Sequence, residues 1–328
     1  MMKEVRIVAP SMSLDKKREP EIKKTQTYFQ KLGYNLTIGN YIFDKDKYYG
    51  CSSIKRRVKD LMDAFKDDNV EIIVCADGGY NVNQILPYLD YEIIQNNPKM
   101  MVGFSDITVL LNAIYTKTKL VTYLGPMLTS FASNDNYTLD NFEKILNNNS
   151  YIVEPSKMIF DYIKVEGKSN KITLKNNGLT ILQEGNASGK IIGGNLCSLN
   201  LLQGTEYMPD IDDAILFIED DADDYAEDVF LLEFDRNLES LLQCCKNIKG
   251  IIFGRFQQCS NMNIRKLKAC ISKKEKLKNI PIVCGADFGH TKPMITIPIG
   301  GYCMINANKD KLEIKIERRN NYVKNTEC

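Results

Sequence analysis

A serine, a glutamate and the only histidine of the chain each follow a short apolar run that is typical of a buried strand. They are Ser105 (after residues 100–103), Glu219 (after 214–218) and His290 (after 281–284). A serine hydroxyl becomes nucleophilic when an imidazole accepts its proton, and the imidazole needs a carboxylate that fixes its tautomer and stabilises its cation. Ligands of open α/β sheets bind at the carboxyl ends of the strands. These residue types therefore make a serine hydrolase with a Ser-His-Glu triad a candidate function.

Each of the three residues also has a purely structural interpretation. Ser105 precedes a segment with helical apolar spacing, so it can be a helix cap. Glu219 opens an acidic run and can be a solvated strand end, and a lone His290 is commonly structural. The order serine, glutamate, histidine is that of the α/β-hydrolases, but residues 103–107 lack the second glycine of G-x-S-x-G. A catalytically silent module that binds a small ligand therefore stays open beside a hydrolase on a different scaffold.

Two pairs of glycines mark places where the backbone can approach a ligand or another strand closely. Gly78-Gly79 follows the apolar run 71–76. Adjacent glycines allow positive φ and leave N–H groups pointing outward, so this pair is either a plain tight turn or an oxyanion-binding turn. It matches neither a Walker loop nor a G-x-G-x-x-G fingerprint. For Gly193-Gly194 we expect a turn at the entry to the second half.

Composition and charge narrow the class of protein. The chain has 328 residues, 44% of them hydrophobic and 26% charged, and a net charge of +1. We therefore expect neither nucleic acid nor a membrane as partner. With a single histidine and consecutive rather than alternating carboxylates at 219–221, we expect no metal and no other cofactor. The N-terminal residues lack the apolar core of a signal peptide, and no run approaches a membrane span, so we expect a cytoplasmic protein.

The first half of the sequence predicts a parallel α/β sheet. Expected strands lie at 5–10, 34–38, 71–76, 100–102 and 120–124, and expected helices lie near 18–32, 52–65, 82–89 and 107–114. Strands that alternate with helices at this interval are typical of a doubly wound sheet with helices on both faces.

The pattern changes after about residue 146. A polar stretch suggests a linker with a hairpin, and the strict alternation of strands and helices is then lost. Expected strands follow at 214–218, 250–253 and 281–284, expected helices at 226–244 and 262–277, and a β-rich tail at 299–316. We expect a domain over residues 1–150, an interdomain segment over 151–185, and a smaller β-rich α+β domain over 186–328.

The motifs together resemble the LD-carboxypeptidase and microcin-immunity family of serine peptidases, with the closer kinship to the microcin-immunity branch. They run along nearly the whole chain at residues 7–11, 78–81, 103–108, 125–126, 193–196, 216–220 and 288–291. The resemblance implies a flavodoxin-like N-terminal domain, a β-rich C-terminal domain, an active site between them and a homodimer.

The resemblance also implies roles for single residues. The nucleophile would be Ser105, the general base His290 and the orienting acid Glu219. Backbone N–H groups of Asp106 and of the Gly78-Gly79 turn would bind the oxyanion. Tyr80 and Asn195 would contact the substrate.

Two departures from the family concern the substrate. Microcin-immunity enzymes stack tryptophans of the interdomain loop on a nucleobase, but this chain has no tryptophan; Phe160 and Tyr162 could take that place. Those enzymes also carry basic residues after the triad glutamate, whereas four of the five residues 220–224 are aspartates here and would repel a phosphoryl or sulfamoyl group. We expect hydrolysis of an amide bond near the C-terminal end of a small peptide-like substrate. It would be an aminoacyl-nucleotide conjugate or, alternatively, a murein tetrapeptide.

Overall fold

The first half of the chain alternates strands and helices, as its sequence pattern predicts. The computed structural model describes residues 3–133, 135–165, 168–222 and 227–318. With η for 3-10 helices, the elements of this half are β1 (Glu4–Val8), η1 (Lys16–Arg18), α1 (Glu19–Lys31), β2 (Asn35–Ile38), α2 (Ile54–Lys66), β3 (Val70–Cys75), η2 (Val82–Tyr88), α3 (Tyr91–Asn96), β4 (Met100–Gly103), α4 (Ile107–Thr118), β5 (Thr122–Leu124), α5 (Leu128–Phe131) and α6 (Asn136–Asn147).

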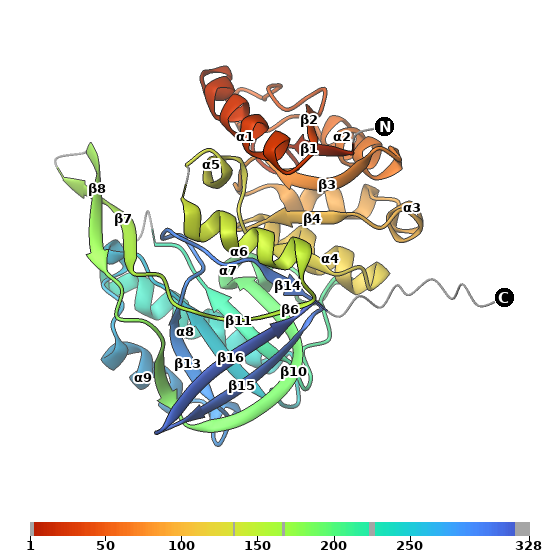
Figure 1. Ribbon diagram of the computed structural model, residues 1–328. Helices are drawn as coiled ribbons and strands as arrows, with labels where there is room; N and C mark the ends of the chain where they lie inside the picture. The colour runs from red at the N-terminus through yellow and green to blue at the C-terminus, as the bar shows by residue number, and fades with distance from the viewer. Residues whose placement is uncertain (1–2, 134, 166–167, 223–226, 319–328) are drawn as a thin grey trace.

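The second half is richer in strands. Its elements are β6 (Ser150–Ile152), β7 (Met158–Val165), β8 (Lys168–Lys175), β9 (Thr180–Gln183), β10 (Gly185–Asn195), α7 (Leu196–Asn200), β11 (Ile215–Glu219), α8 (Glu227–Gln243), β12 (Gly250–Gly254), η3 (Gln258–Ser260), α9 (Ile264–Ser272), η4 (Glu275–Leu277), β13 (Ile282–Ala286), β14 (Ile297–Ile299), β15 (Tyr302–Asn308) and β16 (Lys311–Glu317). The hairpin β7–β8 lies in the segment predicted to link the halves, and Figure 1 shows it at one side of the molecule.

The N-terminal sheet confirms the predicted α/β class. Its strand order is β14-β5-β4-β3-β1-β2, and the strands from β5 to β2 are parallel. Successive residues of β3, such as Ile72, Ile73 and Val74, are all buried. Because neighbouring side chains of a strand point to opposite faces, both faces of the sheet are covered, as is usual for parallel sheets.

The C-terminal sheet is mixed and curved, in the lower part of Figure 1. Its order is β6-β16-β15-β10-β11-β12-β13-β9, with the parallel strands β10 to β13 at its centre. The long strand β10 pairs antiparallel with β15 over residues 185–190 and parallel with β11 over 191–195. The carboxyl ends of β10, β11, β12 and β13 therefore lie along one edge of this sheet.

The two halves meet where α4 packs against the end of β10. The amide of Asn195 donates to Thr108 Oγ1 at 3.0 Å, and Asn112 Nδ2 donates to the carbonyl of Gly193 at 2.9 Å. An ideal Cβ on Gly193 would lie 1.9 Å from the carbonyl oxygen of Phe217, and one on Gly194 would lie 2.4 Å from Thr108 Oγ1. Glycine is needed at both positions, because β10 contacts the backbone of β11 at Gly193 and helix α4 at Gly194.

Two local predictions were wrong. The segment predicted as a helix over 82–89 is the 3-10 helix η2, which contains Pro87 and so cannot form the regular bonds of an α-helix. Gly193-Gly194 does not form a turn but lies inside β10, with φ of 146° and 128°. At the start of the predicted β-rich tail, β14 pairs antiparallel with β5 of the N-terminal sheet.

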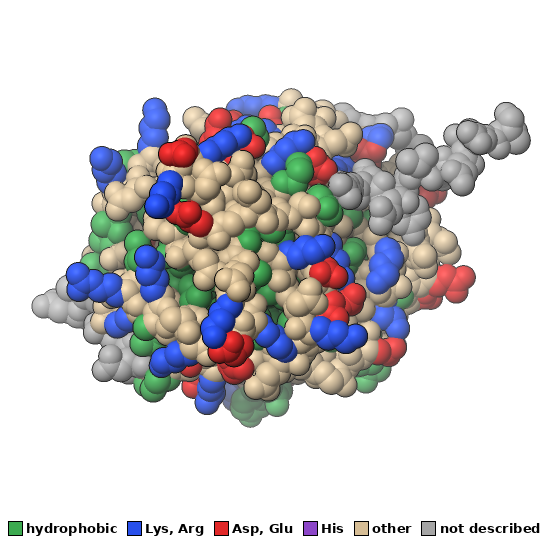
Figure 2. All heavy atoms as spheres, turned by 90° about the horizontal axis from the view of Figure 1, so that it is seen from below, with side chains coloured by type: hydrophobic (Ala, Val, Ile, Leu, Met, Phe, Trp, Pro, Cys, Tyr) green, Lys and Arg blue, Asp and Glu red, His purple; other side chains and the backbone are tan. Residues whose placement is uncertain are grey.

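The surface carries both charges. On the face shown in Figure 2, Lys and Arg side chains are interspersed with Asp and Glu side chains, in keeping with a net charge of +1. Of the helices that the described residues form, none combines the length and the apolar character needed to cross a membrane.

Candidate active site

Ser105 lies in a tight turn between β4 and α4. Its φ is 61°, in the left-handed region that a serine rarely adopts. An ideal Cβ on Gly103 would lie 2.8 Å from Ile107 Cγ2 and 3.0 Å from Cys75 Cβ, so the turn requires glycine. The N-cap position of α4 belongs to Asp106 rather than Ser105. The serine thus occupies an elbow of the nucleophile type without the second glycine of the hydrolase motif.

His290 and Glu219 come from the C-terminal half to meet this serine. His290 Nε2 lies 3.0 Å from Ser105 Oγ, and His290 Nδ1 lies 2.8 Å from Glu219 Oε2. Glu219 is the last residue of β11 and only 1% exposed, so it is not a solvated strand end. Because a carboxylate can only accept, Nδ1 carries the imidazole proton, and Nε2 is left to accept from the serine hydroxyl.

The Gly78-Gly79 turn faces the same serine. An ideal Cβ on Gly78 would lie 2.9 Å from Ser105 Cβ and 3.8 Å from the amide nitrogen of Asp106. One on Gly79, whose φ is 143°, would lie 2.5 Å from Ser11 Oγ. The amide of Gly78 donates to Asp77 Oδ1 at 3.1 Å. Close approach to Ser105 explains the glycine at position 78, and the positive φ with the close approach of Ser11 and Met12 explains the glycine at position 79.

The carboxylate of Asp106, the residue after Ser105, bonds to two neighbouring segments of the N-terminal half. It is buried and accepts hydrogen bonds from Ser11 Oγ and, at 3.0 Å, from the amide of Val82. Burial raises the pKa of Asp106, and these donors act against that rise. Sequence reasoning missed Ser11, although it lies in one of the quoted motifs, because no local pattern reveals a contact across 95 residues.

A cavity of about 520 Å³ opens at Ser105 between the two halves. Tyr80 and Asn195, the predicted substrate contacts, both line it, and Tyr80 is 76% exposed. The complete lining is Met12, Asp77, Gly78, Gly79, Tyr80, Phe104, Ser105, Asp106, Met127, Asn195, Cys197, Ser198, Leu201, Asp220, Asp221 and His290. Among these described residues there is no lysine or arginine.

Asn195 organises two carboxylates at the cavity wall. Its Nδ2 donates to Asp220 Oδ1 at 3.2 Å and to Asp221 Oδ1 at 3.1 Å, and its Oδ1 caps α7 by accepting from the amide of Ser198. Burial, followed by the charges of Glu219 and Asp221, raises the pKa of Asp220 to about 8. The wall is therefore acidic and carries at least one proton at neutral pH. The other acidic residues of this run, at 223 and 224, lie outside the described residues.

The aromatic residues proposed to replace the missing tryptophans do not line this cavity. Phe160 exchanges backbone hydrogen bonds with Lys292, and its ring lies 4.3 Å from Lys171 Nζ. Tyr162 is 49% exposed on the hairpin. Tyr80 is the tyrosine that lines the cavity.

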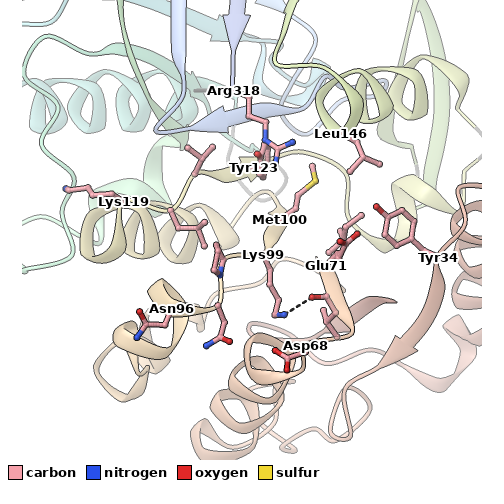
Figure 3. A pocket seen from close by; sticks show the side chains of 16 residues that line it. Tyr34, Asp68, Glu71, Asn96, Lys99, Met100, Lys119, Tyr123, Leu146 and Arg318 are labelled. Carbon is pink, nitrogen blue, oxygen red and sulfur yellow. Dashed lines mark hydrogen bonds between the residues drawn. The ribbon is translucent and has the colours of Figure 1, made fainter. Parts of the chain in front are cut away.

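A second cavity, of about 650 Å³, lies at the opposite ends of the N-terminal strands (Figure 3). Lys99 points into its wall, but Lys99 Nζ donates to the carbonyls of Asp67 and Val70, both at 2.7 Å. Tyr123 and Arg318 lie at the other side of this cavity in Figure 3, with the guanidinium over the ring. Its described lining holds no serine, cysteine or histidine.

Comparison with known proteins defines the class of protein and then the family. Residues 5–125 match the LD-carboxypeptidase N-terminal domain, and residues 188–305 match the LD-carboxypeptidase C-terminal domain. The protein is a peptidase, a hydrolase of amide bonds. As the resemblance of its motifs predicts, the chain belongs to the LD-carboxypeptidase family.

Relatives are similar along nearly the whole chain. The putative carboxypeptidase YocD of Bacillus subtilis (strain 168) is 42% identical, over 96% of this chain and 97% of the relative. The microcin C7 self-immunity protein MccF of Escherichia coli is 31% identical over 88% and 86%. A probable murein peptide carboxypeptidase of Bacillus subtilis (strain 168) is 30% identical over 92% and 88%.

Solved structures share the fold. An MccF-like protein from Bacillus anthracis str. Ames superposes with a TM-score of 0.89, at 41% identity over 96% of this chain and 97% of that one. MccF in complex with aspartyl sulfamoyl adenosine superposes with a TM-score of 0.81, at 28% identity over 97% and 96%.

Proposed function

We propose that the chain is a serine carboxypeptidase in which Ser105 is the nucleophile, His290 the general base and Glu219 the acid that orients the imidazole. The observation that carries the proposal is the continuous chain of contacts, 3.0 Å and 2.8 Å, among three side chains that are 71 to 185 residues apart in sequence. Family membership supports the same assignment. The distances lie in the range in which a base can take a proton from a nucleophile.

The chemistry follows from these contacts. Ser105 Oγ attacks the carbonyl carbon of the scissile amide while His290 Nε2 takes the hydroxyl proton, and Glu219 stabilises the resulting imidazolium. The oxyanion accepts hydrogen bonds from the amides of Asp106 and Gly79, since the amide of Gly78 already donates to a side chain. His290 then gives its proton to the leaving amine. A water molecule, activated by the same imidazole, hydrolyses the acyl-enzyme.

A fluorophosphonate probe tests the nucleophile. Such a probe phosphonylates an activated serine, and intact-protein mass spectrometry reports one adduct for each chain. We expect labelling in the wild-type protein and none in Ser105→Ala. An inert wild-type protein would instead favour the silent binding module.

Two substrate classes remain candidates, each with a specific observation in its favour. MccF binds aspartyl sulfamoyl adenosine in a solved structure, which supports an aminoacyl-nucleotide conjugate. Asp221 lines the cavity, and no lysine or arginine is among its described lining residues, which disfavours a phosphoryl or sulfamoyl linkage; a murein tetrapeptide has no such linkage at its scissile bond. In both cases Tyr80 and Asn195 would contact the substrate.

Product analysis distinguishes these substrates. The enzyme is incubated with a murein tetrapeptide and with aspartyl- and glutamyl-adenylate analogues, and the products are identified by mass spectrometry. Release of the terminal D-residue from the tetrapeptide assigns the murein class. Release of the amino acid from the nucleotide assigns the conjugate class. Ser105→Ala is the control for spontaneous hydrolysis.

We also propose a homodimer, as the family resemblance implies. Light scattering after gel filtration would give twice the chain mass, and the mass of a single chain would contradict the dimer.

A further inference from the structure

His290 is carried by the loop that follows β13, and one buried side chain, Arg255, is bonded to that loop on both sides of the imidazole. Arg255 Nε donates to Thr291 Oγ1 at 2.9 Å, and Nη2 donates to the carbonyl of Pro293. The backbone amide of Arg255 donates to the carbonyl of Phe288 at 3.1 Å. A single residue at the end of β12 thus contacts the loop at positions −2, +1 and +3 from His290.

The same guanidinium forms a buried ion pair with the start of the loop. Arg255 Nη1 lies 2.5 Å from Asp287 Oδ1, and the two side chains are 5% and 0% exposed. Asp287 also accepts from the amide of Ser156 and, at 3.0 Å, from Asn176 Nδ2. Isolated buried charges are costly, and such a pair stabilises a fold only when its remaining polar atoms are also bonded. Here these bonds are made by the loop and by the segment that precedes and follows the hairpin β7–β8.

The loop that carries His290 lies so close to the neighbouring strand ends that two positions there have no room for a side chain. An ideal Cβ on Gly254 would lie 2.6 Å from the carbonyl oxygen of Phe288, and one on Gly289 would lie 3.0 Å from Glu219 Oε2 and 3.2 Å from the carbonyl oxygen of Arg255. The loop therefore lies directly on the ends of β11 and β12. The hydrogen bonds of Arg255 act on this loop together with two ring contacts, of Phe288 with Phe217 at 5.8 Å and of the imidazole with Phe104 at 5.5 Å between centroids.

We propose that Arg255, through its ion pair with Asp287, is a positioning residue that holds the His290 imidazole between Glu219 and Ser105. This inference rests on the proposed function, because it takes His290 as the base. Arg255 itself does not line the cavity at Ser105. A planar guanidinium with several fixed donors suits this role, whereas a lysine ammonium cannot bond the same set of acceptors.

The test compares Arg255→Met, Arg255→Lys and the double variant Arg255→Met with Asp287→Asn. A displacement of about 1 Å in a catalytic group can cost 10²-fold in rate. We expect kcat of Arg255→Met to fall roughly 10- to 100-fold while KM stays within about threefold, and Arg255→Lys to recover only part of kcat. The double variant removes both buried charges, so its melting temperature should recover towards that of the wild type while kcat stays low.

The single histidine provides a direct second readout. Nuclear magnetic resonance of ¹⁵N-labelled protein reports one imidazole, and its Nδ1–H signal should shift or broaden in both Met variants. Lys274→Met is the matched control, because Lys274, between α9 and η4, is also buried and pairs with Asp235 and Glu239 of α8 at 3.0 and 3.3 Å, away from the His290 loop. It should lose stability with kcat and the imidazole signal unchanged.

Two results would have different consequences. If the double variant kept wild-type kcat and an unchanged imidazole signal, Arg255 would have no positioning role, although the proposed function would stand. If His290→Ala itself kept wild-type turnover, the proposed function would be wrong.

Discussion

The N-terminal sheet has a cavity at each end of its strands, and β4 reaches both. Met100, at the start of β4, lines the larger cavity of about 650 Å³, and Ser105, just beyond its other end, lines the smaller cavity of about 520 Å³. The larger cavity has polar walls, but Lys99 is bonded to two backbone carbonyls, of Asp67 after α2 and of Val70 at the start of β3. At the smaller one, a serine with φ of 61° faces an imidazole from the other half. The candidate active site therefore lies at the carboxyl ends of the strands, although the cavity there is the smaller of the two.

The largest expected effect is on kcat, and it distinguishes the two ends of the N-terminal strands. Ser105→Ala should lower kcat roughly 10³- to 10⁶-fold with the fold intact, because the nucleophile is lost. Lys99→Met, at the other end, should leave kcat unchanged but lower the free energy of unfolding by about 1–3 kcal/mol, because the carbonyls of Asp67 and Val70 each lose one donor. Steady-state kinetics and denaturant titration measure both. Equal losses of kcat in the two variants would remove the distinction between the ends.

A smaller effect tests the carboxylate that completes the site. In Glu219→Gln the amide can donate to Nδ1, which favours the wrong imidazole tautomer and leaves the imidazolium without a negative partner. We expect kcat to fall roughly 10²- to 10⁴-fold, as for the equivalent change in other triads. Circular dichroism checks that the variant is folded. Wild-type turnover in this variant would mean that Glu219 is only a buried structural residue.

Acidification should act through the one histidine of the chain. Protonated His290 cannot accept the hydroxyl proton of Ser105, so the rate should fall as the pH drops, by at most about tenfold for each pH unit on the acid limb. A pH–rate profile of kcat/KM measures this. A rate that stays flat between about pH 5 and 8 would contradict His290 as the base.

The smallest expected effect is a pH-dependent change in melting temperature caused by Asp220 in the cavity wall. The pKa of Asp220 is raised from an ordinary carboxyl value to about 8, so the folded state holds a proton that the unfolded state has released. The contribution of Asp220 to stability then falls as the pH rises from about 4 to 8. Asp220→Asn keeps the acceptor oxygen and removes this penalty, so it should raise the melting temperature at pH 8 and change it little at about pH 4. Asp68→Asn, at an exposed position in the other cavity, serves as control; equal melting temperatures of Asp220→Asn and wild type at pH 8 would contradict the raised pKa.

Much of the fold and the members of the candidate site could be predicted from the sequence. Apolar runs of strand length, separated by helical periodicity, predicted the parallel sheet, and the position of Ser105, Glu219 and His290 after such runs made them candidates for one site. The structure places Ser105 after a strand of the N-terminal sheet and the other two at the ends of strands of the C-terminal sheet. Strand ends are local features, so one sequence suffices to find them. The division into 1–150, 151–185 and 186–328 stays a prediction, and the pairing of β14 with β5 joins its first and last parts in one sheet.

The groups that support the site could not be predicted in the same way. Ser11 reaches Asp106 across 95 residues, and Arg255 reaches Asp287 and Thr291 across 32 and 36. An arginine after a strand and a serine after a proline have no local pattern that distinguishes them from surface residues. Gly193-Gly194 was misread for a similar reason, since only the approach of β11 and α4 shows why side chains are excluded there.

The central claim is that Ser105 and His290 act as one unit. The most direct measurement is kcat of Ser105→Ala, His290→Ala and the double variant, with the substrate that product analysis identifies. If the two residues share one step, each single variant loses nearly all of the effect, and the double variant is no slower than the slower single variant. Losses that multiply in the double variant would show that the hydroxyl and the imidazole act independently, and would contradict the account.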